Sequence, residues 1–379
     1  MPAACAHHNH GETHASPSAP HPQSQAAPAR PRARRLPGGA KAGAIQSGGS
    51  WGFYSQVCAS LEILSRIGQA WGMVDILCLG EPMLEFNAQK PGADGRRTYL
   101  EGHGGDTSNA AIAAARAGAS VGMITALGQD GPGESFMQLW AEEGVDTTNI
   151  IRNPAAPTGI YFITHDARGH HFSFYRSGSA ASLYGPADVP EAAIRQAKFL
   201  HLSGISQAIS TTACDGGFRA MEIARAAGTR ISYDTNLRLR LWPAARAASV
   251  IHAAIAMADI ALPSLEDATA LTGLQKPDEI CDFYLRLAPL VVLKCGAEGA
   301  ILATREARHR IPAFKVAAVD ATGAGDCFAG NFLARLLAGD APLEAARYAN
   351  AAAALSTTGY GAVAPLPKPD AVRALLDSD

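Results

Sequence analysis

From residue 74 to the C-terminus, short apolar runs alternate with longer amphipathic stretches. The apolar runs predict buried strands and the amphipathic stretches predict helices. Strands separated by helices indicate an α/β fold, in which helices cover both faces of a mostly parallel sheet. The predicted strands are residues 74–79, 121–127, 199–202, 230–234, 260–262 and 290–294. The predicted helices include residues 108–117, capped by Asp106 or Thr107, and residues 133–143, 325–337 and 342–356.

Two segments, at about 84–104 and 157–180, do not follow this alternation. The second contains two strands of alternating polarity, residues 159–164 and 171–176, on either side of Asp166-Ala167-Arg168-Gly169. That arrangement is typical of a β-hairpin. We therefore expect the two segments to form a small β-sheet lid that excludes water from a site beneath it.

The first part of the chain differs in composition from the rest. Residues 1–50 are rich in Pro, Ala, His and Gly, and Glu12 is their only acidic residue. Such a segment cannot bury enough apolar surface to offset its ordering entropy, which predicts disorder. Because Met73 directly precedes the first strand, an alternative hypothesis is that residues 1–72 are an artefact of the reading frame. Residues 73–379 are expected to form the functional domain, and N-terminal sequencing of the native protein would test the start.

Composition excludes several classes of partner. The 379 residues are 47% hydrophobic and 17% charged, with a formal net charge of −2, so neither nucleic acid nor a membrane surface is expected to bind. No apolar run reaches the ~18 residues of a spanning helix. The seven cysteines are scattered without close pairs, which suits a reducing cytoplasm rather than a disulfide framework or zinc site.

Residues 319–328 suggest where the chemistry lies. A tight glycine turn, Gly323-Ala324-Gly325, leads into a helix with Asp326 in its first turn. Unpaired backbone N–H groups at a helix start bind anions such as phosphate. Two interpretations of Asp326 are possible. It is either a helix-start acid that complements the helix dipole, or a carboxylate base beside an anion hole, as phosphoryl transfer to a hydroxyl requires.

Polar residues at the ends of the predicted strands gather at one sheet edge, where ligands of such sheets bind. They are Ser203, Asp234-Thr235-Asn236, Pro263-Ser264 and Lys294. Arg238 follows one of these ends and Arg176 follows the predicted hairpin. Either arginine could be a solvated surface residue, but two arginines that converge would bind a carboxylate, because a guanidinium group does so through two parallel bonds.

From about residue 74 onward the chain resembles the ribokinase-like (PfkB) carbohydrate kinases. Two segments carry the resemblance: Gly104-Gly105-Asp106-Thr107-Ser108-Asn109, and Asp320-Ala321-Thr322-Gly323-Ala324-Gly325-Asp326-Cys327-Phe328. Within that family the chain is most similar to the 2-keto-3-deoxygluconate kinases. That similarity rests on segments 80–83, 174–176, 202–206 and 234–242.

The resemblance implies a three-layer, Rossmann-type sheet with a β lid, and ATP-dependent phosphorylation of a sugar acid. It implies Asp326 as general base, with Gly323, Ala324 and Gly325 stabilising the transferring phosphate. By motif position, the implied substrate-binding residues are Gly105, Asn109, Phe174, Tyr175, Arg176, Arg238 and Tyr360. The implied ATP-binding residues are Asn236, Lys294, Gly296 and Gly299, with Glu266 near Mg²⁺ through water. Whether a monovalent cation binds near Asp320 and Thr322 stays open, as does assembly into a homo-oligomer through the lid.

The chain also departs from the family pattern. The family's N-x-x-E segment reads Ser264-Leu265-Glu266 here, without its Asn, and Leu237 and Phe174 occupy positions that are often Tyr. A kinase for a neutral sugar such as fructose or ribose therefore stays an alternative. A nucleoside kinase lacks support, because no aromatic box for a base is found. A catalytically silent sugar-binding regulator would not need the intact Asp326 motif.

Overall fold

A computed structural model describes residues 74–92, 94–166 and 169–378 of the chain. The predictions about residues 1–72 lie outside this range. A nine-stranded sheet forms the centre of the described part, in the order β13-β12-β11-β10-β9-β8-β1-β4-β5. All neighbours from β11 to β5 run parallel, and only β12 and β13 are antiparallel to their neighbours. The strands are β1 (Ile76–Leu79), β4 (Val121–Gly128), β5 (Ile150–Asn153), β8 (Phe199–Ser203), β9 (Arg230–Asp234), β10 (Ile260–Leu262), β11 (Leu290–Lys294), β12 (Ala300–Ala303) and β13 (Arg308–Ile311).

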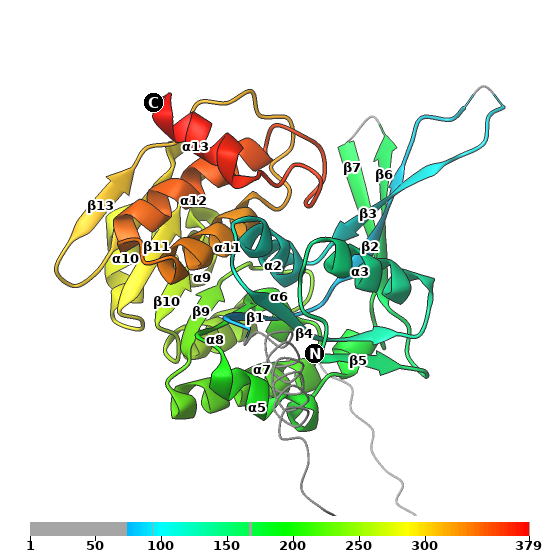
Figure 1. Cartoon of the computed structure of the whole chain (residues 1–379), viewed down its shortest axis with the longest axis horizontal. Coiled ribbons are helices and arrows are strands. Elements are labelled where there is room, and N and C mark those ends of the chain that lie inside the picture. Colours follow the sequence, from blue (N-terminus) through cyan, green and yellow to red (C-terminus); the bar gives the residue numbers. More distant parts are fainter. Residues whose placement is uncertain (1–73, 93, 167–168, 379) are drawn as a thin grey trace, which may run out of the picture. The chain divides into compact units, whose positions relative to one another are not determined.

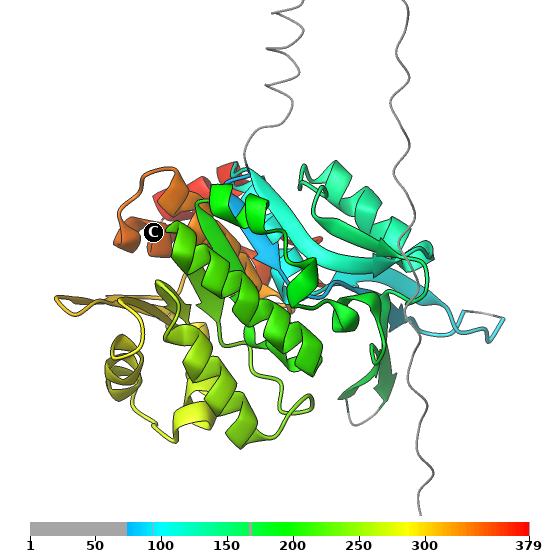
Figure 2. The ribbon, with the colours of Figure 1, turned by 90° about the horizontal axis from the view of Figure 1, so that it is seen from below.

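Helices cover both faces of this sheet, as predicted (Figures 1 and 2). Successive residues of a strand point to opposite faces, so Ile76 and Cys78 enter one apolar core while Leu77 and Leu79 enter the other. The first core is closed by α2 (Asp106–Arg116), α3 (Gly131–Glu142), α11 (Ala324–Leu337), α12 (Pro342–Ser356) and α13 (Pro369–Asp377). The second is closed by α4 (Ala180–Leu183), α5 (Glu191–Gln196), α6 (Gly204–Ala208), α7 (Thr211–Ala227), α8 (Ala244–Ile255), α9 (Leu265–Thr272) and α10 (Pro277–Leu285). The predicted fold class is confirmed.

The start of α2 differs from the prediction. Neither Asp106 nor Thr107 caps this helix: Gly105 occupies the N-cap position with φ 109°, and Asp106 is already helical. Glycine is required there, because a Cβ on Gly105 would lie 2.8 Å from Pro82 Cα. Because the side chain of Asp106 does not cap α2, it can reach the carboxyl ends of the strands instead.

Helices α2 and α11 approach each other closely at Gly330. A Cβ on this residue would meet the carbonyl oxygen of Ala110 and would lie 2.9 Å from both Ala113 Cβ and Ala114 N. The contact lies about one turn beyond Asp326 on α11. The two helices therefore form a single packed unit that carries the predicted base.

We expect Gly330→Ala to lower the free energy of unfolding by about 1–3 kcal/mol, because the added methyl group overpacks the α2–α11 contact. Urea unfolding monitored by circular dichroism measures this loss. Gly131→Ala is the matched control, since nothing lies within 4 Å of a Cβ at that helical position. Equal stability of the two variants would contradict the close approach.

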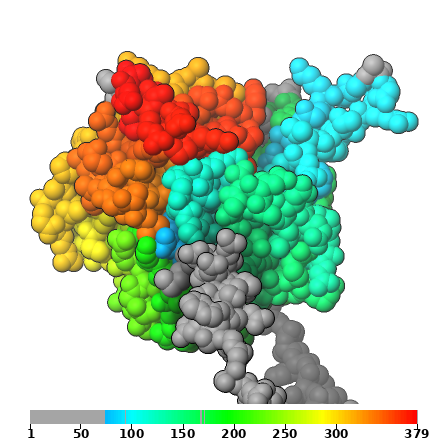
Figure 3. All heavy atoms as spheres, in the orientation of Figure 1, coloured from blue at the N-terminus to red at the C-terminus, as the bar shows by residue number. Residues whose placement is uncertain are grey.

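The second sheet has the order β3-β2-β6-β7 and falls within the segments for which the sequence predicts a lid. Its strands are β2 (Met83–Ala88), β3 (Tyr99–Gly104), β6 (Gly159–Asp166) and β7 (Gly169–Tyr175). β6 and β7 pair antiparallel, which confirms the predicted hairpin, whereas β2 and β6 pair parallel. We call it the lid sheet. Its β2–β3 end, in cyan, extends away from the helical layers (Figure 3). Within the described ranges, no helix is both long and apolar enough to cross a membrane.

Candidate active site

The carboxyl ends of β8, β9 and β11 meet the first turns of α2 and α11 at one edge of the large sheet. β8 ends at Ser203, which pairs in register with Asp234 at the end of β9. β11 ends at Lys294. Three aspartates gather around these ends, Asp106, Asp234 and Asp326, and we call them the acidic cluster. The strand ends at which the sequence predicts a ligand site therefore lie beside the first turns of α2 and α11.

Asp326 does not cap its own helix. Gly323 takes the N-cap position of α11 with φ 75° and without a side-chain hydrogen bond. Instead, Asn109 Nδ2 on α2 donates to Asp326 Oδ2 at 2.8 Å. The predicted base is thus oriented by a residue 217 positions away in the sequence. Asp326 is not the N-cap residue, but it lies in the first turn of α11, where its charge also complements the helix dipole.

Burial raises the pKa of Asp326 to about 8, and the negative charges of Asp106 and Asp234 add to this effect. The hydrogen bond from Asn109 and the charge of Lys294 act in the opposite direction. Asp326 is only half-buried, so part of the residue stays open to solvent. A carboxylate with a raised pKa and an open approach suits a general base.

Asp106 is a member of the site that the sequence did not predict. Its side chain is 7% exposed, and its Oδ2 accepts hydrogen bonds from Ser203 Oγ and from Asn236 Nδ2, the latter at 3.0 Å. Its Oδ1 is buried without a hydrogen-bond partner among the described residues. Such an oxygen is an acceptor left for a ligand or an ordered water.

Lys294 forms a buried ion pair with Asp234, and the two side chains are only 14% and 5% exposed. Burial raises the pKa of Asp234 more than the neighbouring ammonium group lowers it. The Lys294 ammonium group also lies at the start of α11: a Cβ on Gly325 would be 3.2 Å from its Nζ. Lys294 thus adds a positive charge beside the backbone N–H groups of that helix start, a combination that suits an anion.

A buried carboxylate links the chain just before the first lid strand to the chain just after the last one. Glu81, in the turn before β2, accepts hydrogen bonds from Arg176, just after β7, and from Ser179 Oγ at 2.9 Å. Burial raises the pKa of Glu81, although Arg176 and Ser179 lower it. Arg176 is therefore already paired, but its Nε is buried without an acceptor among the described residues.

The lid sheet presents Glu85 and Tyr161 on one face, where the Tyr161 hydroxyl donates to the Glu85 carboxylate. Phe174 lies on the same face, with its ring centroid 5.6 Å from that of Tyr161. Burial raises the pKa of Tyr161, and the charges of Glu85 and Asp320 add to the effect. A Cβ on Gly104 would lie 2.6 Å from the Tyr161 hydroxyl oxygen, so this face lies beside the start of α2.

Tyr175 points to the other face of the lid sheet. Its ring packs edge-on against Phe162 at a centroid distance of 5.8 Å. Strand alternation explains this placement, since neighbouring residues of β7 face opposite ways. The side chain of Tyr175 therefore does not join Phe174, and its predicted substrate contact stays a prediction.

Other predicted site residues lie outside the network that connects the acidic cluster. Arg238 is exposed, and its Nη1 donates to the Leu237 carbonyl oxygen at 2.9 Å. Tyr360 is 80% exposed, and Glu266 is exposed in the first turn of α9. Gly296 and Gly299 form the turn between the antiparallel strands β11 and β12. Within the part of the chain that the structure describes, no group of His, Cys, Asp and Glu side chains could by itself hold a metal ion.

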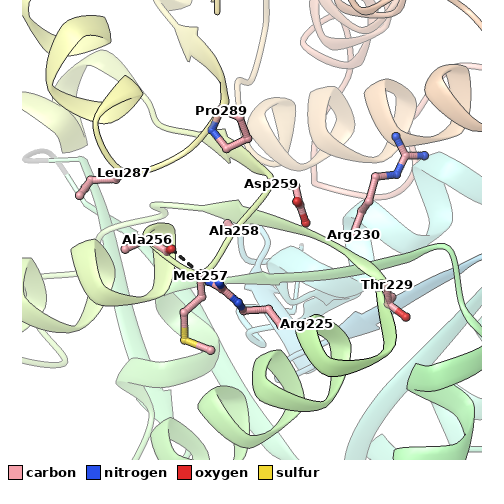
Figure 4. A pocket seen from close by; sticks show the side chains of 10 residues that line it. Arg225, Thr229, Arg230, Ala256, Met257, Ala258, Asp259, Leu287 and Pro289 are labelled. Carbon is pink, nitrogen blue, oxygen red and sulfur yellow. Dashed lines mark hydrogen bonds between the residues drawn. The ribbon is translucent and has the colours of Figure 1, made fainter. Parts of the chain in front are cut away.

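A cavity of about 380 Å³ lies at the opposite edge of the sheet, before β9, β10 and β11 (Figure 4). The polar side chains that line it already form hydrogen bonds with neighbouring segments of the chain. Arg225 Nη1 donates to the carbonyl oxygen of Ala256 at 3.3 Å, and Asp259 Oδ2 accepts from the backbone N–H of Ile231 at 2.7 Å. The cavity does not include the acidic cluster, so it is not the candidate active site.

Known proteins resemble this chain over most of its length. Residues 73–369 match the sequence profile described as pfkB family carbohydrate kinase. A 2-dehydro-3-deoxygluconokinase from Thermoproteus tenax is 35% identical over 319 residues, which cover 81% of this chain and 95% of that protein. Fructokinase-1 from Oryza sativa subsp. japonica is 32% identical over 316 residues, covering 80% and 98%. A solved structure of a putative ribokinase II from E. coli, in complex with ATP and Mg²⁺, superposes with a TM-score of 0.74 at 25% identity, covering 81% of this chain and 100% of that one.

Proposed function

The chain belongs to the pfkB family of carbohydrate kinases, and from this premise we propose that it phosphorylates 2-keto-3-deoxygluconate with ATP to give the 6-phospho product. The enzyme is a sugar kinase, and the identity of its substrate as a sugar acid is our proposal. The observation that carries the proposed chemistry is the half-buried carboxylate of Asp326, oriented by Asn109 at the start of α11. The named activity of the Thermoproteus tenax relative supports the substrate.

The residues present fit the phosphates of ATP. Gly323 and Gly325 are partly exposed at the α11 start, and the Lys294 ammonium group lies beside Gly325. ATP supplies the phosphoryl group, and Mg²⁺ neutralises charge on its phosphates. We propose that Gly323, Ala324, Gly325 and Lys294 surround the transferring group, with Asn236, Gly296 and Gly299 toward the rest of the nucleotide.

The proposed reaction is an in-line transfer. Asp326 accepts the proton of the substrate hydroxyl while that oxygen forms a bond to phosphorus and the bond from phosphorus to the departing ADP oxygen breaks. The backbone N–H groups of α11 and Lys294 stabilise the charge on the moving phosphoryl group. Positioning and charge stabilisation supply most of the rate, because the protein forms no covalent bond.

Two arginines support an acidic substrate. Glu81 occupies one amino group of Arg176, but Arg176 Nε still lacks an acceptor among the described residues. The exposed Arg238 donates only to its neighbour's carbonyl oxygen in the described contacts. A substrate carboxylate would satisfy both groups with charge-assisted hydrogen bonds. Gly105, Asn109 and Phe174 are the other proposed substrate contacts near the cluster and the lid face.

A neutral sugar such as fructose is the second candidate. The Glu81–Arg176 ion pair favours it, because a carboxylate already balances the positive charge of that arginine. The similarity to a rice fructokinase is of nearly the same extent. In this case the Glu85–Tyr161 pair on the lid face would bind hydroxyl groups.

An ADP-release assay over a panel of substrates separates the two candidates. The panel contains 2-keto-3-deoxygluconate, 2-keto-3-deoxygalactonate, gluconate, fructose and ribose, and mass spectrometry identifies each phosphorylated product. The proposal expects the highest kcat/KM for a 2-keto-3-deoxy sugar acid. A higher kcat/KM for fructose or ribose would replace it with the neutral-sugar activity.

Arg238→Ala is expected to raise KM for the sugar acid on the order of 10- to 100-fold, because a hydrogen bond between charged groups contributes roughly 1.5–3 kcal/mol. Initial rates over a range of substrate concentrations at saturating ATP measure this change. Arg240→Ala is the matched control, as Arg240 is another exposed arginine in the same turn. Unchanged KM in Arg238→Ala, or the same rise in both variants, would remove Arg238 from the carboxylate site.

Further proposals concern the setting of the enzyme. The five cysteines of the described residues are free thiols, which supports work in a reducing cytoplasm. Exposed strand edges of the lid sheet are a surface through which two copies could pair. A water-mediated role of Glu266 at Mg²⁺, a substrate contact of Tyr360 and a monovalent cation near Asp320 stay predictions.

A further inference from the structure

The acidic cluster carries more negative charge than its surroundings balance. Asp106 and Asp234 are 7% and 4% exposed, and Lys294 is the cation paired within the cluster. That lysine is committed to Asp234. The charge of Asp106 therefore acts on Asp326 without a cation of its own among the described contacts, and like charges in a buried site favour the protonated form of their neighbour.

Two residues at or just after the carboxyl ends of strands hold the carboxylate of Asp106 in place. Ser203 Oγ and Asn236 Nδ2 both donate to its Oδ2. Asn236 adopts φ 29°, in the left-handed region that residues other than glycine rarely enter. Backbone of this kind persists where surrounding contacts enforce it and is concentrated at functional sites. The carboxylate of Asp106 is thus fixed from outside its own helix.

The same turn of α2 carries Asn109, which donates to Asp326. One turn of helix therefore holds both the charge and the amide group that act on the base, and the close α2–α11 contact at Gly330 keeps this turn against α11. The groups with the largest effect on Asp326 are Asp106 and Asn109 from α2, Asp234 from β9 and Lys294 from β11.

We propose that Asp106 is a positioning residue for the base: Ser203 and Asn236 fix its carboxylate on the turn of α2 whose Asn109 donates to Asp326. The inference rests on the proposed role of Asp326 in the kinase reaction. In the free enzyme, burial and Asp106 together raise the pKa of Asp326, so its carboxylate form is gained as the pH rises through that raised pKa. A general base whose pKa lies near the working pH combines availability with strength.

The test is a carbon-detected NMR titration of the substrate-free protein labelled at the aspartate carboxyl carbons. Comparison with Asp326→Asn identifies the signal of Asp326. The wild-type signal is expected to titrate well above the ordinary aspartate range, and in Asp106→Asn its midpoint is expected at a pH roughly one unit or more lower. Asp106→Ser is the second neutral replacement, should Asp106→Asn not fold.

Asp267→Asn is the matched control. Asp267 also accepts two hydrogen bonds at this sheet edge, from Thr235 Oγ1 at 2.9 Å and from the Leu237 backbone at 3.1 Å, but it is not among the groups with the largest effect on Asp326. An ordinary wild-type midpoint, an unchanged midpoint in Asp106→Asn, or equal shifts in Asp106→Asn and Asp267→Asn would each overturn the proposal. No sugar is present, so the result does not depend on which substrate the enzyme takes.

A kinetic measurement checks the same point in the working enzyme. The acidic limb of the profile of kcat/KM against pH reports the free enzyme's base, and Asp106→Asn should move that limb to lower pH. A purely structural role of Asp106 would lower the rate at every pH and leave the limb in place, which would also overturn the proposal. If no sugar or sugar acid is phosphorylated at all, the proposed function fails while the titration result stands.

Discussion

Asp326→Asn is expected to lower kcat by about 10²- to 10⁴-fold, the usual contribution of a positioned general base. Asparagine has nearly the same shape, and Asn109 can still approach its side-chain oxygen, so the fold should be retained. The coupled ADP-release assay measures kcat, and thermal unfolding checks the fold. KM for the nucleotide should change little, because the carboxylate acts on the hydroxyl proton.

Asp370→Asn serves as the control for this substitution, since the side chain of Asp370 is 98% exposed at the start of α13. Its kcat should equal that of the wild type. Turnover by Asp326→Asn within a few-fold of the wild type would mean that another group accepts the proton, and the assignment of the base would be wrong.

Lys294→Met is expected to affect both stability and turnover. Loss of the ammonium group leaves the carboxylate of Asp234 buried without a cation, which costs roughly 3–5 kcal/mol of folding free energy. It also removes a positive charge beside the α11 start, for which we expect kcat to fall by about 10²- to 10³-fold. Urea unfolding and the kinase assay measure the two effects separately.

The double variant Asp234→Asn/Lys294→Met distinguishes the two roles. It should recover most of the lost stability, because no buried charge is then left unpaired, but its turnover should stay low. Lys198→Met is the control, as its pair with Asp75 is 60% and 30% exposed at the two side chains and exposed pairs contribute about 0–1 kcal/mol. Recovery of turnover in the double variant would limit Lys294 to a structural role.

Much of the architecture follows from local patterns. The predicted strands 230–234, 260–262 and 290–294 agree with β9, β10 and β11 to the residue, because each is an apolar run that ends at a polar turn. β5 was not predicted, since this edge strand is only partly buried and shows no apolar run. α13 was missed for a similar reason: Val372 is its one fully buried side chain.

The site was predictable where residues follow a strand or a glycine turn, as Lys294 and Asp326 do. Asp106 was missed because an acid before a helix resembles an ordinary cap. Its partners Ser203 and Asn236 lie 97 and 130 positions away, and contacts over such separations leave no periodic signal in a single sequence. The pairing of Arg176 with Glu81, 95 positions apart, was hidden for the same reason.

The buried Glu81 sets a condition for redesigning the enzyme. Substrate preference in this fold could be altered by grafting the lid strands of a relative onto the large sheet. Glu81 belongs to the turn before the first grafted strand, whereas its donors Arg176 and Ser179 follow the last one. A graft that omits these donors would leave a carboxylate unpaired in the interior, at a cost of several kcal/mol of folding free energy. The lid is therefore exchangeable only as a segment that includes both sides of this junction.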